Sequence, residues 1–136
     1  MSVTFEIPGQ PFGKQRPRFN SRTRRTYTPA KTTEYQARVK AAGAQHCAQA
    51  LTGPVRVEIM ASFEPAPSWS RKRRQAALGT YHTQKPDFDN IAKAICDGLN
   101  GTAFTDDSQV AECSVVKVWG PVARTVVTIE PIGGEA

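Results

Sequence analysis

The sequence predicts a single α+β domain, in which about three helices pack with a small mixed β-sheet of about four strands. Its 136 residues, of which 39% are hydrophobic, are enough for one modest core. Segments with the two-residue period of strands occur alongside segments of helical composition. No repeat or low-complexity linker interrupts the chain, so we expect one domain over residues 1–136.

The first half of the chain predicts a strand, a long loop and a helix. Residues 3–8 alternate roughly between apolar and polar side chains, as a strand does. Residues 9–28 are rich in Gly, Pro, Arg and Thr and are expected to form a long loop, a kind of segment that is often functional. A helix capped by Thr32 or Thr33 should then run to about Ala50, because Ala, Gln, Arg and Lys favour helix.

The middle of the chain predicts a second strand and a short basic helix. Clean alternation of apolar side chains predicts the strand over residues 54–63. Ser68 or Ser70 is expected to cap the helix over residues 69–78, and Gly79 is expected to end it.

A third helix and two further strands complete the predicted domain. Pro86 precedes the helix, which is expected over about residues 88–99. Residues 109–119 and 123–130 predict the strands, and Gly120-Pro121 between them indicates a hairpin.

The overall composition favours a cytoplasmic protein that binds a polyanion. The formal net charge is +6 and the sequence pI is about 9.6, and nucleic acid is the commonest partner of such domains. No apolar run reaches the roughly 18–20 residues of a membrane span, and the N-terminus does not resemble a signal peptide. We therefore expect an intracellular protein with no membrane partner.

Neither the cysteines nor the histidines suggest a metal site. Cys47, Cys96 and Cys113 are odd in number and far apart in sequence, which argues against a disulfide framework or a zinc pattern. We expect them to be buried free thiols. His46 and His82 have no partner at metal-ligand spacing, so we interpret both as structural or phosphate-contacting.

The charges are segregated along the chain. One basic cluster comprises Lys14, Arg16, Arg18, Arg22, Arg24 and Arg25, and a second comprises Arg71, Lys72, Arg73 and Arg74. All five aspartates lie between positions 87 and 107. A cation centre flanked by phosphate-binding surfaces would need this arrangement, because Mg²⁺ prefers carboxylates and a DNA backbone prefers Lys and Arg. The alternative is that each cluster is a solvated face.

Aromatic side chains allow two interpretations. Phe12, Phe19 and Tyr27 lie among the arginines, where they would either anchor the loop or stack on bases. Trp69 and Trp119 are expected in the core or at an interface.

The aspartates suggest a magnesium site. Residues four apart share a helix face, so the helix at 88–99 carries Asp89, Lys93 and Asp97 together, opposite an apolar face. Carboxylates from a helix start, with one from a strand start, are a common way to bind a divalent cation that keeps several waters. Spacing alone does not separate a nuclease from another phosphoryl-transfer enzyme.

Each of these side chains also has a purely structural interpretation. Asp87 is placed to cap the helix, and Asp89 would interact with the helix dipole. Lys93 would form an ion pair with Asp89, and Asp97 would be solvated. The adjacent aspartates 106–107 are typical of a turn.

The segment from Lys85 to Val110 resembles the RusA family of Holliday-junction resolvases. Its residues KPDFDNIAKAICDGLNG, followed by TDDSQV, match a family pattern of roughly KPDxDNxxKxxxDxLNG and DDxQ. The flanking GKQRPRF (13–19) and TYTP (26–29) are similar to phage-type members. One departure is Gly98, which stands where alanine is usual and should weaken the helix end.

The resemblance implies a function and a site. Family members are homodimers that cut four-way DNA junctions by paired symmetric nicks in recombination and repair, with Mg²⁺ or Mn²⁺ as cofactor. Asp87, Asp89 and Asp107 match the metal-site aspartates, with the neighbouring Asp106 as a further candidate ligand, and Lys93 matches a lysine near the metals. We therefore expect a bacterial or phage-encoded junction endonuclease.

The two basic clusters and Lys85 would hold the DNA arms through their phosphates. Two alternatives remain open: a non-catalytic, structure-selective DNA-binding module, and a metal nuclease for other branched nucleic acids.

Overall fold

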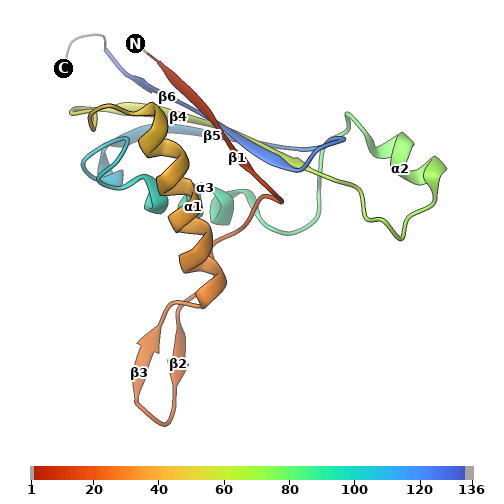
Figure 1. Cartoon of the computed structure of the whole chain (residues 1–136), viewed down its shortest axis with the longest axis horizontal. Helices are drawn as coiled ribbons and strands as arrows, with labels where there is room; N and C mark the ends of the chain where they lie inside the picture. Colours follow the sequence, from red (N-terminus) through yellow and green to blue (C-terminus); the bar gives the residue numbers. More distant parts are fainter. Residues whose placement is uncertain (1, 134–136) are drawn as a thin grey trace.

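A four-stranded mixed sheet with helices on one face forms the body of the protein. The computed structural model describes residues 2–133, and Figure 1 shows their arrangement. The sheet order is β1-β6-β4-β5, with β1 at Val3–Pro8, β4 at Val55–Phe63, β5 at Val110–Trp119 and β6 at Arg124–Pro131. The α+β prediction is confirmed. No helix among residues 2–133 is long and apolar enough to cross a membrane.

The hairpin predicted for the last two strands is wrong. β4 lies between them, parallel to β5 and antiparallel to β6. The connection from β5 to β6 instead crosses the end of β4, where Gly120 N–H donates to the Phe63 carbonyl (2.9 Å) and Ser62 Oγ donates to the Val122 carbonyl (3.0 Å). β4 takes the inner position because its alternate apolar side chains, Val55, Val57, Ile59, Ala61 and Phe63, are all buried.

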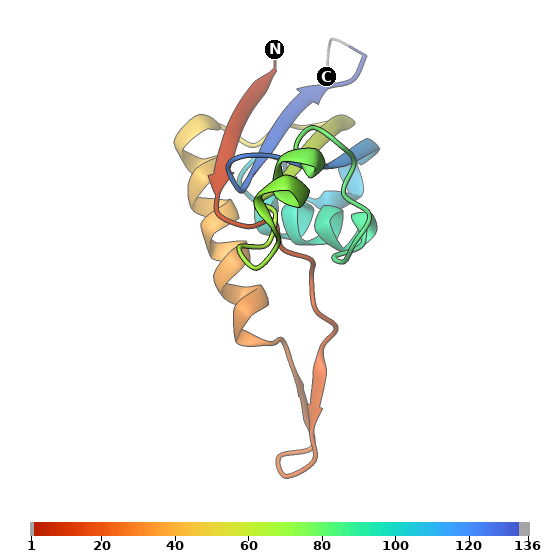
Figure 2. The same cartoon turned by 90° about the vertical axis from the view of Figure 1, so that its right-hand side faces the viewer.

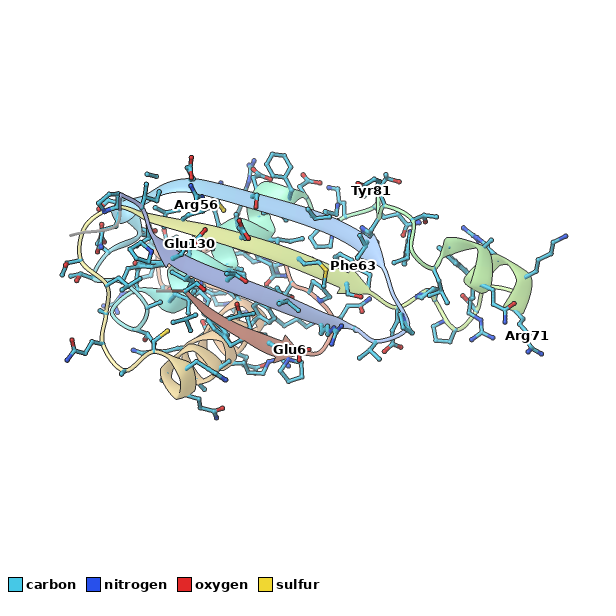
Figure 3. All side chains as sticks on the ribbon, turned by 90° about the horizontal axis from the view of Figure 1, so that it is seen from above. Glu6, Arg56, Phe63, Arg71, Tyr81 and Glu130 are labelled. Carbon is cyan, nitrogen blue, oxygen red and sulfur yellow. The ribbon has the colours of Figure 1, made fainter. Side chains whose placement is uncertain are left out.

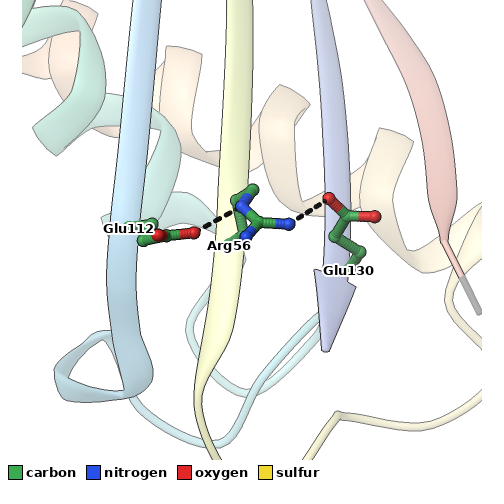
Figure 4. Close-up of polar contacts among 3 residues, drawn as sticks. All are labelled: Arg56, Glu112 and Glu130. Atoms are coloured by element: carbon green, nitrogen blue, oxygen red, sulfur yellow. Dashed lines mark hydrogen bonds and ion pairs between the residues drawn. The ribbon is translucent and has the colours of Figure 1, made fainter. Parts of the chain in front are cut away.

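An ion-pair triad ties three strands together on the face that no helix covers. Arg56 on β4 reaches Glu112 on β5 (Nε–Oε2, 2.5 Å) and Glu130 on β6 (Nη1–Oε1, 2.7 Å), as Figure 4 shows. Figure 3 looks onto this face, where Glu6 on β1 lies further along the sheet and pairs with Arg124 on β6 (Nη1–Oε1, 2.9 Å). The pairs join neighbouring strands and therefore fit the observed strand order.

The predicted loop at residues 9–28 contains a second, two-stranded sheet. β2 (Arg18–Asn20) pairs antiparallel with β3 (Arg25–Tyr27), and this hairpin projects away from the body (Figure 1). Asn20 Oδ1 accepts hydrogen bonds from the backbone N–H groups of Arg22 (2.9 Å) and Thr23 (3.3 Å), which shapes the turn. The expectation of an irregular loop over this whole segment was therefore wrong.

The helices differ from prediction mainly at their ends. α1 (Ala30–His46) begins after Pro29 rather than at a threonine cap, because Thr32 is buried within the helix and accepts a hydrogen bond from Gln15 N–H (3.2 Å). It ends at His46, four residues before the predicted end at Ala50. α2 (Arg71–Ala77) is capped by Ser70 Oγ, as predicted. It projects beyond the end of the sheet (Figure 1). α3 (Phe88–Leu99) lies under the sheet beside α1, and the short 3₁₀ helix η1 (Asp107–Gln109) leads into β5.

Gly98 allows α1 and α3 to approach closely. A Cβ atom added at this position would lie 2.8 Å from Val39 Cβ and 3.1 Å from the Gln36 carbonyl oxygen, both on α1. Glycine therefore stands at this position, where alanine is usual in the family pattern, for a packing reason. The stabilisation from the close contact between the two helices is larger than the helix propensity lost at glycine.

We predict that Gly98→Ala lowers stability. The added methyl group would cost about 1–3 kcal/mol of overpacking, against roughly 1 kcal/mol gained from helix propensity. The midpoint of urea denaturation, compared with wild type, measures the net effect. Ala44→Gly, at an exposed position of α1, calibrates propensity alone. A Gly98→Ala variant more stable than wild type would show that the helices separate without cost.

Candidate active site

The beginning of α3 presents two carboxylates to solvent. Asp87 occupies the N-cap position, but its side chain makes no capping hydrogen bond, so the capping interpretation is not supported. Asp89 follows in the first turn, and both residues are exposed. Ile91 behind them is fully buried and fixes this end of the helix against the core. Both carboxylates are therefore free to meet a ligand from solvent.

The segment before the hairpin lies along α3. Lys14 N–H donates to the Asn90 carbonyl (2.9 Å), and its ammonium reaches seven residues further to form an ion pair with Asp97. A Cβ atom added at Gly13 would lie 2.6 Å from Pro86 Cβ, so only glycine allows this approach. The segment is thus held at the start of α3 and, through the lysine, near its end. Lys14 was predicted to contact DNA, and its ammonium is already engaged by a carboxylate here.

Asp97 and Asp107 meet near the other end of α3. Asp97 is half-buried, so its interpretation as a solvated residue is wrong. Burial, followed by the hydrogen bond to Asp97 and the neighbouring charges, raises the pKa of Asp107, while a hydrogen bond with Asn100 lowers it. Two carboxylates in contact favour either a shared proton or a bound cation.

Asp106 and Asp107 have different roles. Asp106 caps η1: its Oδ2 accepts from Ser108 N–H (3.1 Å), and its own N–H donates to Gln109 Oε1 (2.9 Å). Hydrogen bonds from the side chain and the backbone N–H of Ser108 lower the pKa of Asp106. Gln109 Nε2 in turn donates to the Leu51 carbonyl (2.9 Å). The turn interpretation therefore holds for Asp106, whereas Asp107 faces α3.

The predicted metal ligands lie as two groups. Asp89 and Asp97 are eight residues apart on α3, which is about 12 Å along the helix axis. Within the described residues, no three His, Cys, Asp or Glu side chains gather closely enough to hold one ion. All the donors are carboxylate oxygens, so the chemistry fits Mg²⁺, but a single chain does not bring Asp87, Asp89 and Asp107 together.

Lys93 is a free cation on the exposed face of α3. It is exposed and forms no ion pair with any side chain in the part of the protein described, so the predicted pairing with Asp89 is not formed. Its ammonium is available to a phosphate.

The two basic clusters lie on elements that project from the body. The arginines at 18, 22, 24 and 25 lie on the hairpin β2–β3, and those at 71–74 belong to α2 with Lys72; all are exposed. Figure 2 shows the hairpin extending from the body on one side, well away from the sheet. We call the hairpin β2–β3 the hairpin arm (residues 18–27) and α2 the helical arm (residues 71–77). Arg16 and Lys85, which lie outside the arms, are exposed as well.

Of the three aromatic side chains in the loop, one anchors the loop and two are exposed. Phe12 is half-buried and packs against Tyr35 with ring centroids 5.3 Å apart, so it anchors the segment. Phe19 and Tyr27 on the hairpin arm are 63% and 47% exposed and anchor nothing in the core.

Two cysteines meet beside this site, which the sequence did not indicate. Cys96 on α3 lies beside Cys113 on β5, and the interaction between the two thiols lowers the pKa of Cys113 to about 7. Cys113 is exposed, and Cys47 and Cys96 are half-buried, so the expectation of three buried thiols was wrong. The contact joins a helix to a strand across 17 positions and leaves no local pattern.

Comparison with known proteins identifies the family. The family model described as "Endodeoxyribonuclease RusA" matches residues 8–130, nearly the whole chain. The chain belongs to the RusA family. The match includes α3, η1 and both basic arms. RusA proteins are endodeoxyribonucleases, so the resemblance seen in the sequence is confirmed at this level.

A curated relative supports the same extent of similarity. The chain is 30% identical over 138 aligned residues to the Bacillus subtilis (strain 168) protein named "Uncharacterized protein YqaN", with 96% of both chains covered. The two chains therefore correspond over nearly their full lengths.

We predict opposite effects on stability for the two adjacent aspartates. Asp107→Asn should raise the melting temperature in EDTA, because it removes a charge held against Asp97. Asp106→Ala should lower it, since the variant loses the side chain that caps η1. Thermal melts of both variants beside wild type measure this. A lower melting temperature for Asp107→Asn in EDTA would contradict the carboxylate contact.

Proposed function

We propose that this protein is a Mg²⁺-dependent endodeoxyribonuclease that resolves four-way DNA junctions by paired symmetric nicks. The observation that carries the proposal is the pair of exposed carboxylates at the start of α3, Asp87 and Asp89, beside Lys93, which has no ion-pair partner among residues 2–133. Membership of a family of endodeoxyribonucleases supports the reaction class. The two basic arms supply the surfaces that would hold the DNA.

Asp87 and Asp89 would hold the cation, with Mn²⁺ able to replace Mg²⁺. Asp107 completes the proposed set through its match to the family motif, although in one chain it lies with Asp97. When bound, the cation would polarise the scissile phosphate and lower the pKa of a water. Asp106 contributes indirectly, because its cap orients η1 and so its neighbour.

The chain's own cations would act on the phosphate. Lys93 lies on the same helix face as Asp89, one turn further along, and would stabilise the negative charge that develops as the phosphodiester is attacked. Lys85 precedes Asp87 by two residues and would hold the adjacent phosphate. The arms would then bind DNA by phosphate contacts that position the strand without reading bases.

A homodimer would match the substrate. A four-way junction has near two-fold symmetry, and resolving it requires nicks in two opposing strands. Two copies related by a two-fold axis would place one α3 helix at each strand. Each copy would contribute its own hairpin arm and helical arm, so the junction would be recognised by its shape.

Junction cleavage tests the proposal. Wild type with Mg²⁺ should cut a synthetic four-way junction into paired nicks, while Asp89→Asn should bind the junction and leave it uncut. Glu58→Gln is the matched control, because Glu58 is an exposed carboxylate of β4 on the sheet face that no helix covers. Gel analysis of end-labelled arms measures both cleavage and symmetry.

The outcomes separate the alternatives. Binding without cleavage under Mg²⁺ and Mn²⁺ would favour a non-catalytic DNA-binding module. Faster cleavage of flaps or branched RNA than of the junction, at equal concentration, would favour a nuclease for other structures. Equal cleavage by wild type and Asp89→Asn would move the site away from the start of α3.

Lys93 has a separate prediction. Lys93→Ala should lower the single-turnover cleavage rate by about 10²-fold or more, with little change in junction affinity, because its charge acts on the transition state. Lys40→Ala, at an exposed position of α1, controls for the loss of one positive charge. An unchanged rate would remove Lys93 from the mechanism.

A further inference from the structure

An aromatic hollow lies between the helical arm and the end of the sheet. It measures about 570 Å³, and the side chains that matter to its chemistry are Phe63, Trp69, Arg73, His82, Lys85 and Trp119. Figure 3 shows Phe63 at the end of β4 nearest α2, which locates the hollow. None of these residues except Arg73 and Lys85 has a role in the site described above.

The walls of the hollow are stacked rings. His82 lies against Phe63 with ring centroids 3.7 Å apart and planes inclined by 14°, and against Trp119 at 4.4 Å. Trp69 packs on Trp119 at 5.0 Å, and the Arg73 guanidinium lies 3.7 Å from the Trp69 ring centre. The hollow therefore has planar walls with a cation over one of them, a suitable setting for another flat ring.

His82 lines this hollow with a ring that is held in place. The residue is only 6% exposed, and its Nδ1 is closed off from solvent and has no partner among the residues that the structure describes. Its backbone N–H donates to the Lys117 carbonyl (2.9 Å), which holds His82 beside β5. Burial, and then the nearby Lys117 charge, lower the pKa of His82, which favours the neutral ring. A neutral ring in a fixed position is a suitable stacking wall.

The hollow adjoins a second one at the start of α3. A second hollow, lined in part by Lys14, Asp87 and Asn90, shares Pro11, Lys85 and Pro86 with the first. Lys85 thus stands between the aromatic walls and the proposed cleavage site.

The charge at the hollow favours an anionic ligand. Arg73 and Lys85 line it, and the rest of the helical arm adds further cations nearby. Glu64 is the one carboxylate in the lining, and its Oε1 already accepts a hydrogen bond from Ala123 N–H (3.1 Å).

We propose that this hollow binds an unstacked nucleobase of the DNA strand that enters the site. The base would stack on the aromatic walls, while Arg73 and Lys85 hold the phosphates on either side. This inference rests on the proposed function, because it takes DNA as the ligand. It adds a contact that depends on the presence of a base, which the phosphate-binding arms lack.

Tryptophan fluorescence tests the proposal without cleavage. Trp69 and Trp119 are the two tryptophans of the chain, and both line the hollow. In EDTA, wild type is titrated with a ten-nucleotide thymidine strand and with a ten-nucleotide abasic strand of the same charge. We expect the thymidine strand to quench the fluorescence and to bind about five-fold or more tightly than the abasic strand.

Two variants assign the effect to the hollow. His82→Ala removes one stacked ring, and Trp69→Leu removes one half-buried wall. Each should reduce the preference for the thymidine strand and leave the affinity for the abasic strand unchanged. His46→Ala is the matched control, since His46 is an exposed histidine at the end of α1 that stacks on Phe5. Should His82→Ala fail to fold, Trp69→Leu carries the test alone.

The outcomes distinguish this inference from the nuclease proposal. Equal affinity for both strands without quenching overturns the base-binding hollow, even if junctions are cut. Failure of both strands to bind overturns it as well and leaves the hollow to a different kind of ligand. Base-dependent quenching without any junction cleavage supports base binding in the hollow and contradicts the nuclease proposal.

Discussion

The close packing of α3 against both α1 and the sheet is the constraint on which the site depends. Ile91, Ile95 and Leu99 are fully buried on one face, and Gly98 brings α1 to within contact distance through Val39. A helix that is fixed on its inner face has no freedom to rotate, so its outer face is set as well. The positions of Asp89 and Lys93 therefore follow from apolar packing rather than from any polar contact of their own.

Much of the fold could be predicted because it follows from local patterns. α3, the strands of the sheet and the Ser70 cap all lie close to their predicted positions, since periodicity and capping are encoded within a few residues. The strand order could not be predicted in this way. Alternation shows which face of β5 or β6 is buried but not which strand lies beside it, and Gly120-Pro121 marks a reversal whether or not another strand intervenes.

The site shows the same division between local and distant information. The motif identified the individual aspartates, and Asp106 and Asp107 could be told apart only by their contacts. Lys14 and Asp97 are separated by 83 positions, so no spacing rule relates them. The signal for the hairpin arm was present in Asn20, whose side chain shapes the turn, but the many Gly, Pro and Thr residues around it indicated irregular structure.

The two arms have one further property: both stand outside the core. Every residue of the hairpin strands is exposed, and those of α2 are exposed or half-buried. Natural variation in these segments is therefore nearly neutral for folding, and selection can act on them almost independently of the rest of the chain. Lineages that meet different branched DNAs can diverge in arm length and sequence while the sheet and α3 are inherited unchanged.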